Sequence, residues 1–405
     1  MPKREDRPIE LLLWGATGFT GRLAAEWLAA RYADARVALG GRSAEKLEAL
    51  RDTLIAIDAR CAAWPIRVAD ALDVPALDRI VPEAAVVATT AGPFSKYGHE
   101  LVAACARHGT DYCDITGEVP FARALLDRNQ ERARDSGARL VPFCGFDSIP
   151  SDLGVFVLQE FARRELGATC DEATFVLIRA RGGFSGGTAA SAIAISEAAS
   201  NDARVREMLH DPYALAPDDH GSGATDASGA TKIDGAWTAP FAMGTINSRV
   251  VHRSNALLDF PYGRDFRYEE RVVLGKGSRA FVRAEAMSVG LALGERILGF
   301  GAARALAKRF LPAPGEGPSK ERRETGSFHV RILGKNAGKV VAVCNISGQG
   351  DPGYTGAAKM LVESAFCLSR DVKSDGGMVT PASCMGDGLT ARLRAAGIAF
   401  DASRA

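Results

Sequence analysis

The 405-residue sequence lacks a charge imbalance and is poor in aromatic residues. Its 50 Lys and Arg residues are matched by 49 Asp and Glu residues, and aromatic residues make up 7% of the chain. A chain with so little net charge has no general attraction for nucleic acid, so any anion specificity must be local. We therefore expect no nucleic-acid partner.

Cysteine and histidine are present, but without the spacing of a metal site or a disulfide framework. The eight cysteines form no C-x-x-C pair, and the six histidines form no H-x-x-x-H or Cys/His cluster. This pattern predicts no metal and buried thiols in a reducing compartment. The amino-terminal sequence MPKREDRPIELLLWG has no apolar segment followed by a cleavage site, so we expect a cytoplasmic protein.

The sequence has no long hydrophobic run that is free of charge. The most apolar stretch outside the amino-terminal region, residues 287–311, has Glu295 and Arg296 near its middle and three basic residues after them. These charges argue against a helix that spans a bilayer. Three interpretations stay open: a packed helix of a second domain, a lid over an apolar substrate, or a helix that lies on a membrane surface.

The length and the apolar pattern indicate two domains, residues 1–150 and 151–405. In the first, short apolar runs alternate with longer helical patterns, which is typical of a doubly wound parallel sheet, the Rossmann arrangement. The expected strands are residues 9–14, 36–39, 66–68, 85–89, 112–115 and 139–144. The expected helices include residues 22–32, 45–57, 98–107 and 119–136.

The second domain has the less regular pattern of an α+β fold with a mixed or antiparallel sheet. A helix is expected over residues 151–166, with Ser151 or Asp152 as its N-cap. Alternation of polar and apolar residues predicts strands at 171–181, 266–275, 278–289, 326–334 and 338–348. Two stretches rich in Gly, Ser, Asp or Pro, 218–235 and 311–326, predict loops. The C-terminal segment can also pack back on the first domain.

The stretch LLLWGATGFTGRLAAEWLAA, residues 11–30, carries three evenly spaced glycines. An apolar strand precedes Gly15 and a helical pattern follows Gly21, which is the order that a dinucleotide-binding loop requires. Gly15 would allow the tight turn, Gly18 would let backbone N–H groups approach the pyrophosphate, and Gly21 would let the helix pack on its strand. The alternative is a strand-to-helix turn without a ligand. The further predicted cofactor contacts in this loop are Thr17, Phe19 and Thr20.

The end of the second strand, VALGGRSAEKL, carries no carboxylate. Proteins that prefer NAD normally place Asp or Glu there, against the ribose 2′-hydroxyl. Here Arg42 and Ser43 supply a guanidinium and a hydroxyl that suit a 2′-phosphate. This predicts NADP(H) as the cofactor, and the alternative is that Arg42 caps a surface turn.

Further candidates follow the third and fourth strands, because ligands of an open parallel sheet collect at the strand ends. Asp70 is placed to contact the adenine. Tyr97 is the candidate proton or hydrogen-bond donor, or else it packs beneath the cofactor ribose. Phe94 is also interpretable as a core residue. The predicted contacts near the nicotinamide ribose, in the stretch TTAGPFSKYG, are Ala91, Gly92, Pro93 and Phe94.

Polar residues also follow the fifth and sixth strands. In DYCDITGEV, Asp114 and Glu118 are expected at the same edge as the glycine loop, with Gly117 between them, although Glu118 could instead cap the next helix. Asp147, in GFDSIPSD, is a candidate catalytic or substrate-binding residue, or a hinge residue. In GGFSGGTAAS, the run from Gly186 to Thr188 is expected to begin a helix, with or without a ligand at its N–H groups.

The segments GATGFTG, GRS, AGPFSKYGHELVAACARHGTDYCDITGE and PFCGFDSIPSDLG together resemble the saccharopine dehydrogenase-like oxidoreductases, in particular the trans-acting enoyl reductase branch. The likeness continues in GGFSGGTAASA (182–192), GDPGYTGAAKMLVESAF (350–366) and GGMVTPASCMGDGLTARLRAAGIAF (376–400). Residues 201–235 look more extended and richer in glycine than expected for the family. The resemblance implies an NADP(H)-binding Rossmann domain with Gly15, Gly18, Gly21, Arg42, the 91–94 turn, Tyr97 and the 114–118 loop intact.

The resemblance implies an NADPH-dependent reductase of an activated C=C bond on a lipid or polyketide-type acyl chain. Two alternatives stay open: a saccharopine-type enzyme acting on a C–N bond, and a non-catalytic, lipid-associated NADP(H)-binding protein. The expected partners are a small-molecule or acyl-chain substrate, free or bound to a carrier protein, and a second copy in a homodimer. Contact with a membrane surface, without spanning it, is also consistent with the sequence.

Overall fold

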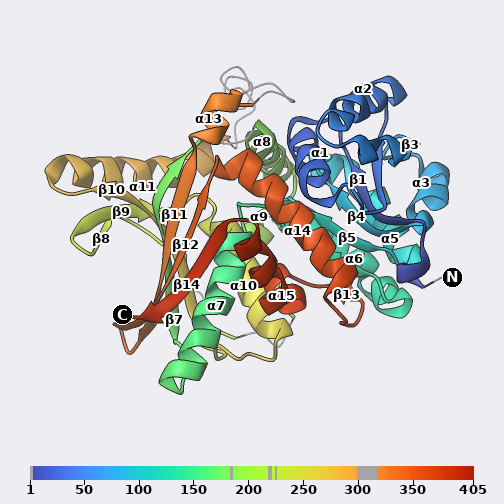
Figure 1. Ribbon diagram of the computed structural model, residues 1–405. Coiled ribbons are helices and arrows are strands. Elements are labelled where there is room, and N and C mark those ends of the chain that lie inside the picture. Colours follow the sequence, from blue (N-terminus) through green and yellow to red (C-terminus); the bar gives the residue numbers. More distant parts are fainter. Residues whose placement is uncertain (1–2, 183–185, 218–220, 224–225, 299–316) are drawn as a thin grey trace.

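The computed structural model describes residues 3–182, 186–217, 221–223, 226–298 and 317–405 (Figure 1). Two seven-stranded sheets organise this part of the chain. The first is built mainly from the amino-terminal region and the second from the remainder, and the C-terminal segment contributes to both.

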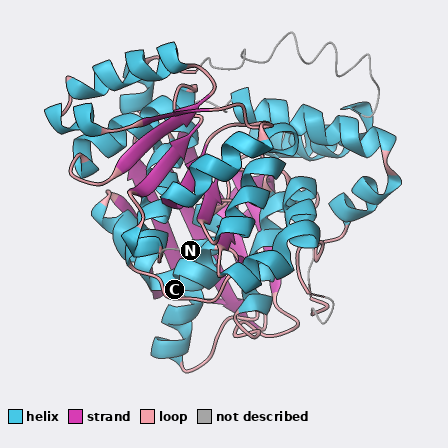
Figure 2. Ribbon diagram, turned by 90° about the vertical axis from the view of Figure 1, so that its right-hand side faces the viewer, coloured by secondary structure: helices cyan, strands magenta, loops and turns pink. Residues whose placement is uncertain are grey.

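The first sheet is parallel, with the strand order β13-β6-β5-β4-β1-β2-β3. Helices cover both of its faces (Figure 2). Its strands are β1 (Ile9–Trp14), β2 (Val37–Gly41), β3 (Ile66–Val68), β4 (Ala84–Thr89), β5 (Asp111–Asp114), β6 (Arg139–Val141) and β13 (Gly377–Met378). Its helices are α1 (Phe19–Tyr32), α2 (Ala44–Ile55), α3 (Val74–Ile80), α4 (Phe94–Tyr97), α5 (His99–His108) and α6 (Val119–Ser136).

All six predicted strands of this sheet are present, which confirms the doubly wound arrangement. Every residue of β4 is buried, as expected for a central strand of a parallel sheet that is covered on both faces. The predicted sixth strand was too long. β6 ends at Val141 because Pro142 has no N–H to donate and Phe143 has a positive φ of 68°.

The C-terminal segment packs against the first domain. It adds β13 beside β6, and α14 (Ala357–Arg370) lies against α1 and β4. Glu363 of α14 is buried, and its carboxylate accepts hydrogen bonds from Trp27 Nε1 at 3.0 Å and from the Tyr32 hydroxyl at 2.7 Å. These bonds satisfy a buried carboxylate and join α14 to α1.

The second sheet is mixed, with the strand order β14-β12-β11-β7-β10-β9-β8. Only β7 and β10 run parallel to each other, and the other neighbours are antiparallel. Its strands are β7 (Glu172–Arg181), β8 (Thr231–Ile233), β9 (Ala236–Pro240), β10 (Arg267–Gly275), β11 (Ser327–Asn336), β12 (Lys339–Gln349) and β14 (Ile398–Arg404). The remaining helices are α7 (Ile149–Leu166), α8 (Gly186–Asn201), α9 (Ala203–His210), α10 (Gly244–Leu257), α11 (Ser278–Leu298), α13 (Lys320–Glu324) and α15 (Pro381–Ala395).

Three predictions for this domain were wrong. The expected strand at residues 278–289 is the first half of α11, because its buried residues Ala280, Ala284 and Ser288 repeat every fourth position, which is helical spacing. The expected loop at 218–235 includes β8, and the expected loop at 311–326 includes α13. Residues 218–220, 224–225 and 311–316 of these two stretches lie outside the described residues.

The helix expected from residue 151 begins earlier, as α7, with Ser148 at its N-cap and Pro150 in its first turn. Asp152 is therefore not the cap but a buried residue within the helix. Its carboxylate accepts hydrogen bonds from the Ser254 hydroxyl and from the Ala382 N–H. Burial raises the pKa of Asp152 to about 7.

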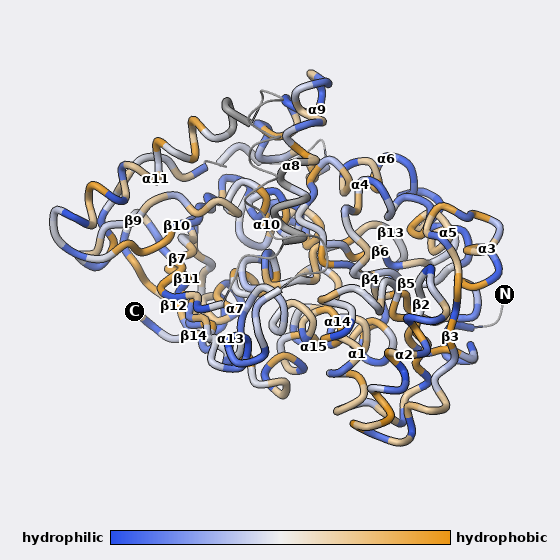
Figure 3. Tube along the Cα trace, turned by 90° about the horizontal axis from the view of Figure 1, so that it is seen from above, coloured by the Kyte–Doolittle hydropathy of each residue, from blue (hydrophilic) through white to orange (hydrophobic). Residues whose placement is uncertain are grey.

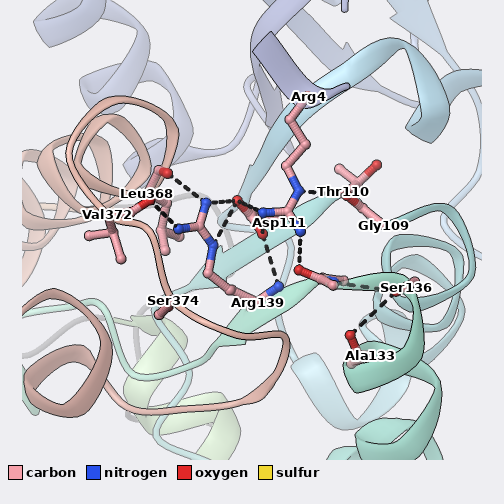
Figure 4. A network of polar contacts seen from close by, with 12 residues as sticks. Arg4, Gly109, Thr110, Asp111, Ala133, Ser136, Arg139, Leu368, Val372 and Ser374 are labelled. Atoms are coloured by element: carbon pink, nitrogen blue, oxygen red, sulfur yellow. Dashed lines mark hydrogen bonds and ion pairs between the residues drawn. The ribbon is translucent and has the colours of Figure 1, made fainter. Parts of the chain in front are cut away.

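A polar network at the amino ends of β5 and β6 joins the start of the chain to its C-terminal part (Figure 4). Asp111 pairs with both Arg4 and Arg139. Arg139 also donates to the carbonyls of Leu368 and Val372, each at 2.7 Å. The network lies at the opposite edge of the sheet from the glycine loop, so we assign it a structural role.

Candidate functional site

The predicted glycine loop joins β1 to α1 at the carboxyl edge of the first sheet. Gly15 has φ +77°, and a Cβ at this position would lie 3.0 Å from the backbone nitrogen of Ala91. A Cβ at Gly21 would lie 2.2 Å from the Gly15 carbonyl oxygen, whereas one at Gly18 would lie 3.3 Å from it. Gly15 and Gly21 are thus required by the close packing of the loop, and Gly18 is not.

Gly18 is the N-cap of α1 and is exposed. The N–H of Arg22 donates to the Gly18 carbonyl at 2.8 Å, which is the first bond of the helix. The N–H groups of the first turn of α1, from Phe19 to Gly21, are the ones that a helix leaves for an anion. Thr17 and Thr20 are half-buried beside this turn. The ring of Phe19 lies 4.8 Å from the ring of Tyr354, so this predicted cofactor residue also contacts the chain between β12 and α14.

Arg42 and Ser43 follow β2, next to the glycine loop. The N–H groups of Gly15 and Ala16 both donate to the Gly40 carbonyl, at 3.0 and 3.2 Å, which ties the two strand ends together. The Arg42 side chain is exposed and forms no ion pair within the described part of the chain. The Ser43 hydroxyl accepts a long hydrogen bond of 3.4 Å from the Lys46 N–H, as the N-cap of α2. The guanidinium is therefore available to a phosphate, while the hydroxyl also caps a helix.

Asp70 follows β3 and is exposed, and its carboxylate accepts a hydrogen bond of 2.9 Å from the Leu72 N–H. This bond folds the chain into a local turn at the same edge of the sheet as Arg42. The contact of the exposed Asp70 with the adenine stays a prediction.

Glu118 holds the loop after β4 in place through hydrogen bonds. This residue is fully buried, and its carboxylate accepts hydrogen bonds from the N–H groups of Phe94 at 2.8 Å and Ser95 at 2.9 Å. The Ser191 hydroxyl of α8 donates to the same carboxylate at 2.8 Å. Glu118 therefore positions the predicted nicotinamide loop and connects it to the second domain. Its own oxygens are engaged by the protein.

The same loop contains the other predicted cofactor residues. Ala91 lies against Gly15, and the Thr90 hydroxyl donates to the Gly15 carbonyl at 3.2 Å. Gly92 is exposed and Pro93 is half-buried. Phe94 is only 5% exposed, and its ring lies 5.9 Å from that of Phe121, so its side chain belongs to the core.

Asp114, at the end of β5, is fully buried rather than open to a ligand. It accepts hydrogen bonds from the Tyr112 hydroxyl at 2.7 Å and from the N–H groups of Thr116 and Phe143 at 3.0 and 3.2 Å. Burial raises its pKa to about 7. Asp114 thus fixes the loops after β5 and β6. Gly117 is half-buried, and a Cβ there would lie 3.5 Å from Met243 Cε, at the start of α10.

The two catalytic candidates lie in the loops after β4 and β6, at the same edge of the sheet, with β5 between the two strands. Tyr97, at the end of α4, is half-buried, and the Lys96 ammonium lies 5.1 Å from its ring centre. Asp147 is half-buried in the loop after β6, and its backbone carbonyl accepts a hydrogen bond of 2.7 Å from Asn247 of α10.

A buried polar cluster behind Asp147 was not predicted from the sequence. Glu270 of β10 is 1% exposed and accepts hydrogen bonds from the Ser151 and Tyr268 hydroxyls, each at 2.6 Å, and from Asn247 at 3.2 Å. The Ser148 hydroxyl donates to Asn247 at 2.8 Å. Burial raises the pKa of Glu270 to about 7. The alternating pattern of β10 did not indicate this cluster, because the partners Ser151 and Asn247 come from α7 and α10.

The predicted helix start at Gly186 is observed as the first residue of α8. Residues 183–185 of the same glycine-rich stretch lie outside the described residues. A hollow of about 500 Å³, lined in part by Ile9, Val37 and Trp64, lies at the amino ends of β1 and β2. It is therefore on the opposite edge of the sheet from the residues above.

The comparisons with known proteins agree with this geometry. Residues 11–141 match the family model described as saccharopine dehydrogenase NADP binding domain. The trans-acting enoyl reductase of Mycobacterium ulcerans (strain Agy99) is 39% identical, over 98% of this chain and 98% of its own. A protein of Mycobacterium tuberculosis (strain H37Rv) that carries the same name provisionally is 41% identical, again over 98% of both chains.

The chain belongs to the trans-acting enoyl reductase family. The apo structure of saccharopine dehydrogenase (L-Glu forming) from Saccharomyces cerevisiae shares the fold, with a TM-score of 0.56 at 12% identity, over 98% of this chain and 100% of that one. The predicted family, the α/β fold, the NADP(H) cofactor and the class of NADP-dependent oxidoreductase are thereby confirmed.

Two further properties of this trans-acting enoyl reductase family member follow from the described residues. Seven of its eight cysteines are buried and none forms a disulfide, as the scattered cysteines predicted. No described helix combines the length and the apolar character that crossing a bilayer requires.

Proposed function

We propose that this protein uses NADPH to reduce the C=C bond of an enoyl thioester on a lipid or polyketide-type acyl chain. The observation that carries the proposal is the convergence of the glycine loop, an exposed Arg42, and the loop bearing Tyr97 at one edge of an NADP-binding domain. Relatives at about two-fifths identity over nearly the whole chain are named trans-acting enoyl reductases.

Each group of residues has a separate task in cofactor binding. The N–H groups at the start of α1 bind the pyrophosphate, with Thr17 and Thr20 beside them. Arg42 and Ser43 bind the 2′-phosphate, and Asp70 contacts the adenine side. Ala91, Gly92 and Pro93 line the nicotinamide ribose. Asp114, Gly117 and Glu118 hold the adjoining loops in place, and Phe94 anchors the loop in the core.

The bound NADPH supplies a hydride to the β-carbon of the enoyl thioester. Negative charge then develops on the thioester oxygen, and the α-carbon requires a proton. The Tyr97 hydroxyl donates a hydrogen bond to that oxygen or a proton to that carbon. Asp147 orients the substrate from the loop after β6, and Asn247 fixes that loop through the Asp147 carbonyl.

The test is reduction of enoyl thioesters by purified protein with NADPH, followed as loss of nicotinamide absorbance. Tyr97→Phe is expected to lower kcat by about 10² or more, the usual scale for a lost acid–base group, while NADPH binding stays unchanged. If the protein oxidises NADPH when an oxo acid and an amine are supplied, but not when an enoyl thioester is supplied, it would instead be assigned to the reduction of a C–N bond.

The acyl chain is proposed to arrive either free or on a carrier protein, and the protein is proposed to form a homodimer. Comparing the same acyl group on coenzyme A and on a carrier protein separates the two routes. Sedimentation equilibrium measures the oligomeric state.

A further inference from the structure

The helix α11 exposes more large hydrophobic side chains than any other element of the described chain. Among the described residues, four of the nine exposed large hydrophobic side chains lie on this helix: Phe281 at 39%, Val282 at 63%, Val289 at 52% and Leu293 at 46% exposure. The other five are distributed over several elements. Single exposed apolar residues are normal, whereas a cluster on one element indicates a surface that contacts something else.

Four exposed apolar residues of α11 form one stripe along the helix. Val282, Ala286, Val289 and Leu293 are all exposed and follow one another at intervals of four, three and four residues. That spacing places them on the same side of an α-helix. Ala280, Ala284 and Ser288 are buried on the side that packs against β9 and β10. A helix that is apolar on its inner and its outer face is normally covered on both.

Basic residues border the stripe. Lys276, Arg279 and Arg283 are exposed, and none of them forms an ion pair within the described part of the chain. Between residues 276 and 294 the sequence has a single acidic residue, Glu285. The stripe therefore combines apolar side chains with an excess of positive charge, the pattern of helices that lie in the surface of an anionic bilayer.

The neighbouring β8–β9 hairpin extends this surface with an aromatic residue. The ring of Trp237 lies 4.6 Å from that of Phe281, and the Lys232 ammonium lies 4.8 Å from the Trp237 ring centre. Tryptophan and lysine are the side chains that favour the boundary between lipid and water. Figure 1 shows α11 and this hairpin at the end of the molecule away from the first domain, and Figure 3 shows α11 along the periphery. A flat surface can therefore reach the stripe.

We propose that the outer face of α11, together with Trp237 and Lys232, is a docking surface for an anionic lipid bilayer. A second copy of the chain fits less well. The whole helix of 21 residues is about 30 Å long and about 10 Å wide, so the stripe covers less than about 300 Å², well below the ~800 Å² per partner of a stable interface. Pairing the same faces would also bring like charges together.

The experiment is cosedimentation of the full-length protein with phosphatidylcholine vesicles, with and without phosphatidylglycerol. We expect binding to the vesicles that contain phosphatidylglycerol, and weaker binding at high salt. The double variant Val282→Ser, Val289→Ser should reduce the bound fraction at least about tenfold, and Arg279→Glu with Arg283→Glu should do the same. Thermal melting of each variant checks that it is folded.

Ile57→Ser is the matched control, because Ile57 is similarly exposed, at 47%, but lies on the first domain. This variant should bind vesicles as the unchanged protein does. The proposal is overturned if the unchanged protein does not bind anionic vesicles, or if the α11 variants bind as well as Ile57→Ser. A dimer that dissociates in the α11 variants, without vesicle binding, would assign the face to a second copy. The assay needs no enzymatic turnover, so its outcome is independent of the proposed reaction.

Discussion

Substituting two glycines of the same loop is expected to have different consequences. In Gly21→Ala the new Cβ would lie 2.2 Å from the Gly15 carbonyl oxygen and 2.9 Å from Thr90 Oγ1. The first distance is about 1 Å shorter than a normal carbon–oxygen contact. The carbonyl has little room to move, because Thr90 donates to it and the Gly15 N–H is bonded to the Gly40 carbonyl.

Overpacking of this kind typically costs about 1–3 kcal/mol. For a domain of this size that corresponds to a decrease in Tm of roughly 2–12 °C. Because the displaced segment is also the phosphate loop, the Kd for NADPH should rise at least about tenfold. In Gly18→Ala the Cβ would lie 3.3 Å from the same oxygen, so the folded state should tolerate it. Its methyl group nevertheless stands where the cofactor phosphate approaches, so NADPH binding should weaken without a loss of Tm.

The assays are thermal melting without cofactor and calorimetric titration with NADPH. Gly290→Ala is the matched control, because a Cβ at this helical position meets no atom within 4 Å. The reasoning would be refuted if Gly21→Ala kept both the Tm and the affinity. It would also be refuted if Gly18→Ala lost as much stability as Gly21→Ala.

Three other predictions concern charge. Arg42→Ala should raise the Kd for NADPH by about 10- to 100-fold, which is the scale of hydrogen bonds to a charged group. The Kd for NADH should stay unchanged. An equal loss of affinity for both cofactors would contradict the role of Arg42. In Glu118→Gln, one of the two carboxylate oxygens that accept from the Phe94 and Ser95 N–H groups becomes an amide donor. The KM for NADPH should therefore rise roughly tenfold. Unaltered kinetics would contradict the positioning role of Glu118. Burial raises the pKa of Asp152 from 3.8 to about 7, so the unfolded chain releases this proton at lower pH than the folded protein does. The free energy of unfolding should therefore decrease as the pH rises from about 4 to about 7, by up to about 1.4 kcal/mol per pH unit from this group. Urea unfolding of Asp152→Asn should show a shallower decrease, and an unchanged slope would contradict this assignment.

The first domain was predictable because its signals are local. The apolar runs that form β1 and β4 are continuous, and the glycine loop is flanked by the strand and helix that it requires. The place of Arg42, directly after β2 and beside the glycine loop, could also be predicted from the local sequence. In each case the deciding residues are close together in the chain.

The second domain was harder to predict because its signals are ambiguous or non-local. Residues 278–289 alternate in polarity well enough to suggest a strand, yet their buried positions have helical spacing. Glu270 depends on Asn247 and Ser151, which lie on two other elements, so its burial and raised pKa cannot be inferred from β10 alone. Asp114 and Glu118 lie after β5 at the edge of the sheet where the sequence predicted them, while their contact with the cofactor stays a prediction. However, the donors that engage their carboxylates could only be identified from the structure.

The central claim is that a hydride passes from NADPH to an enoyl thioester on this protein. The most direct measurement uses NADPH deuterated at the transferable C4 position and identifies the saturated thioester by mass spectrometry. We predict one deuterium on the β-carbon of the product, formed with NADPH in preference to NADH. A saturated product without the label, or label transfer only to the product of an oxo acid and an amine, would contradict the claim.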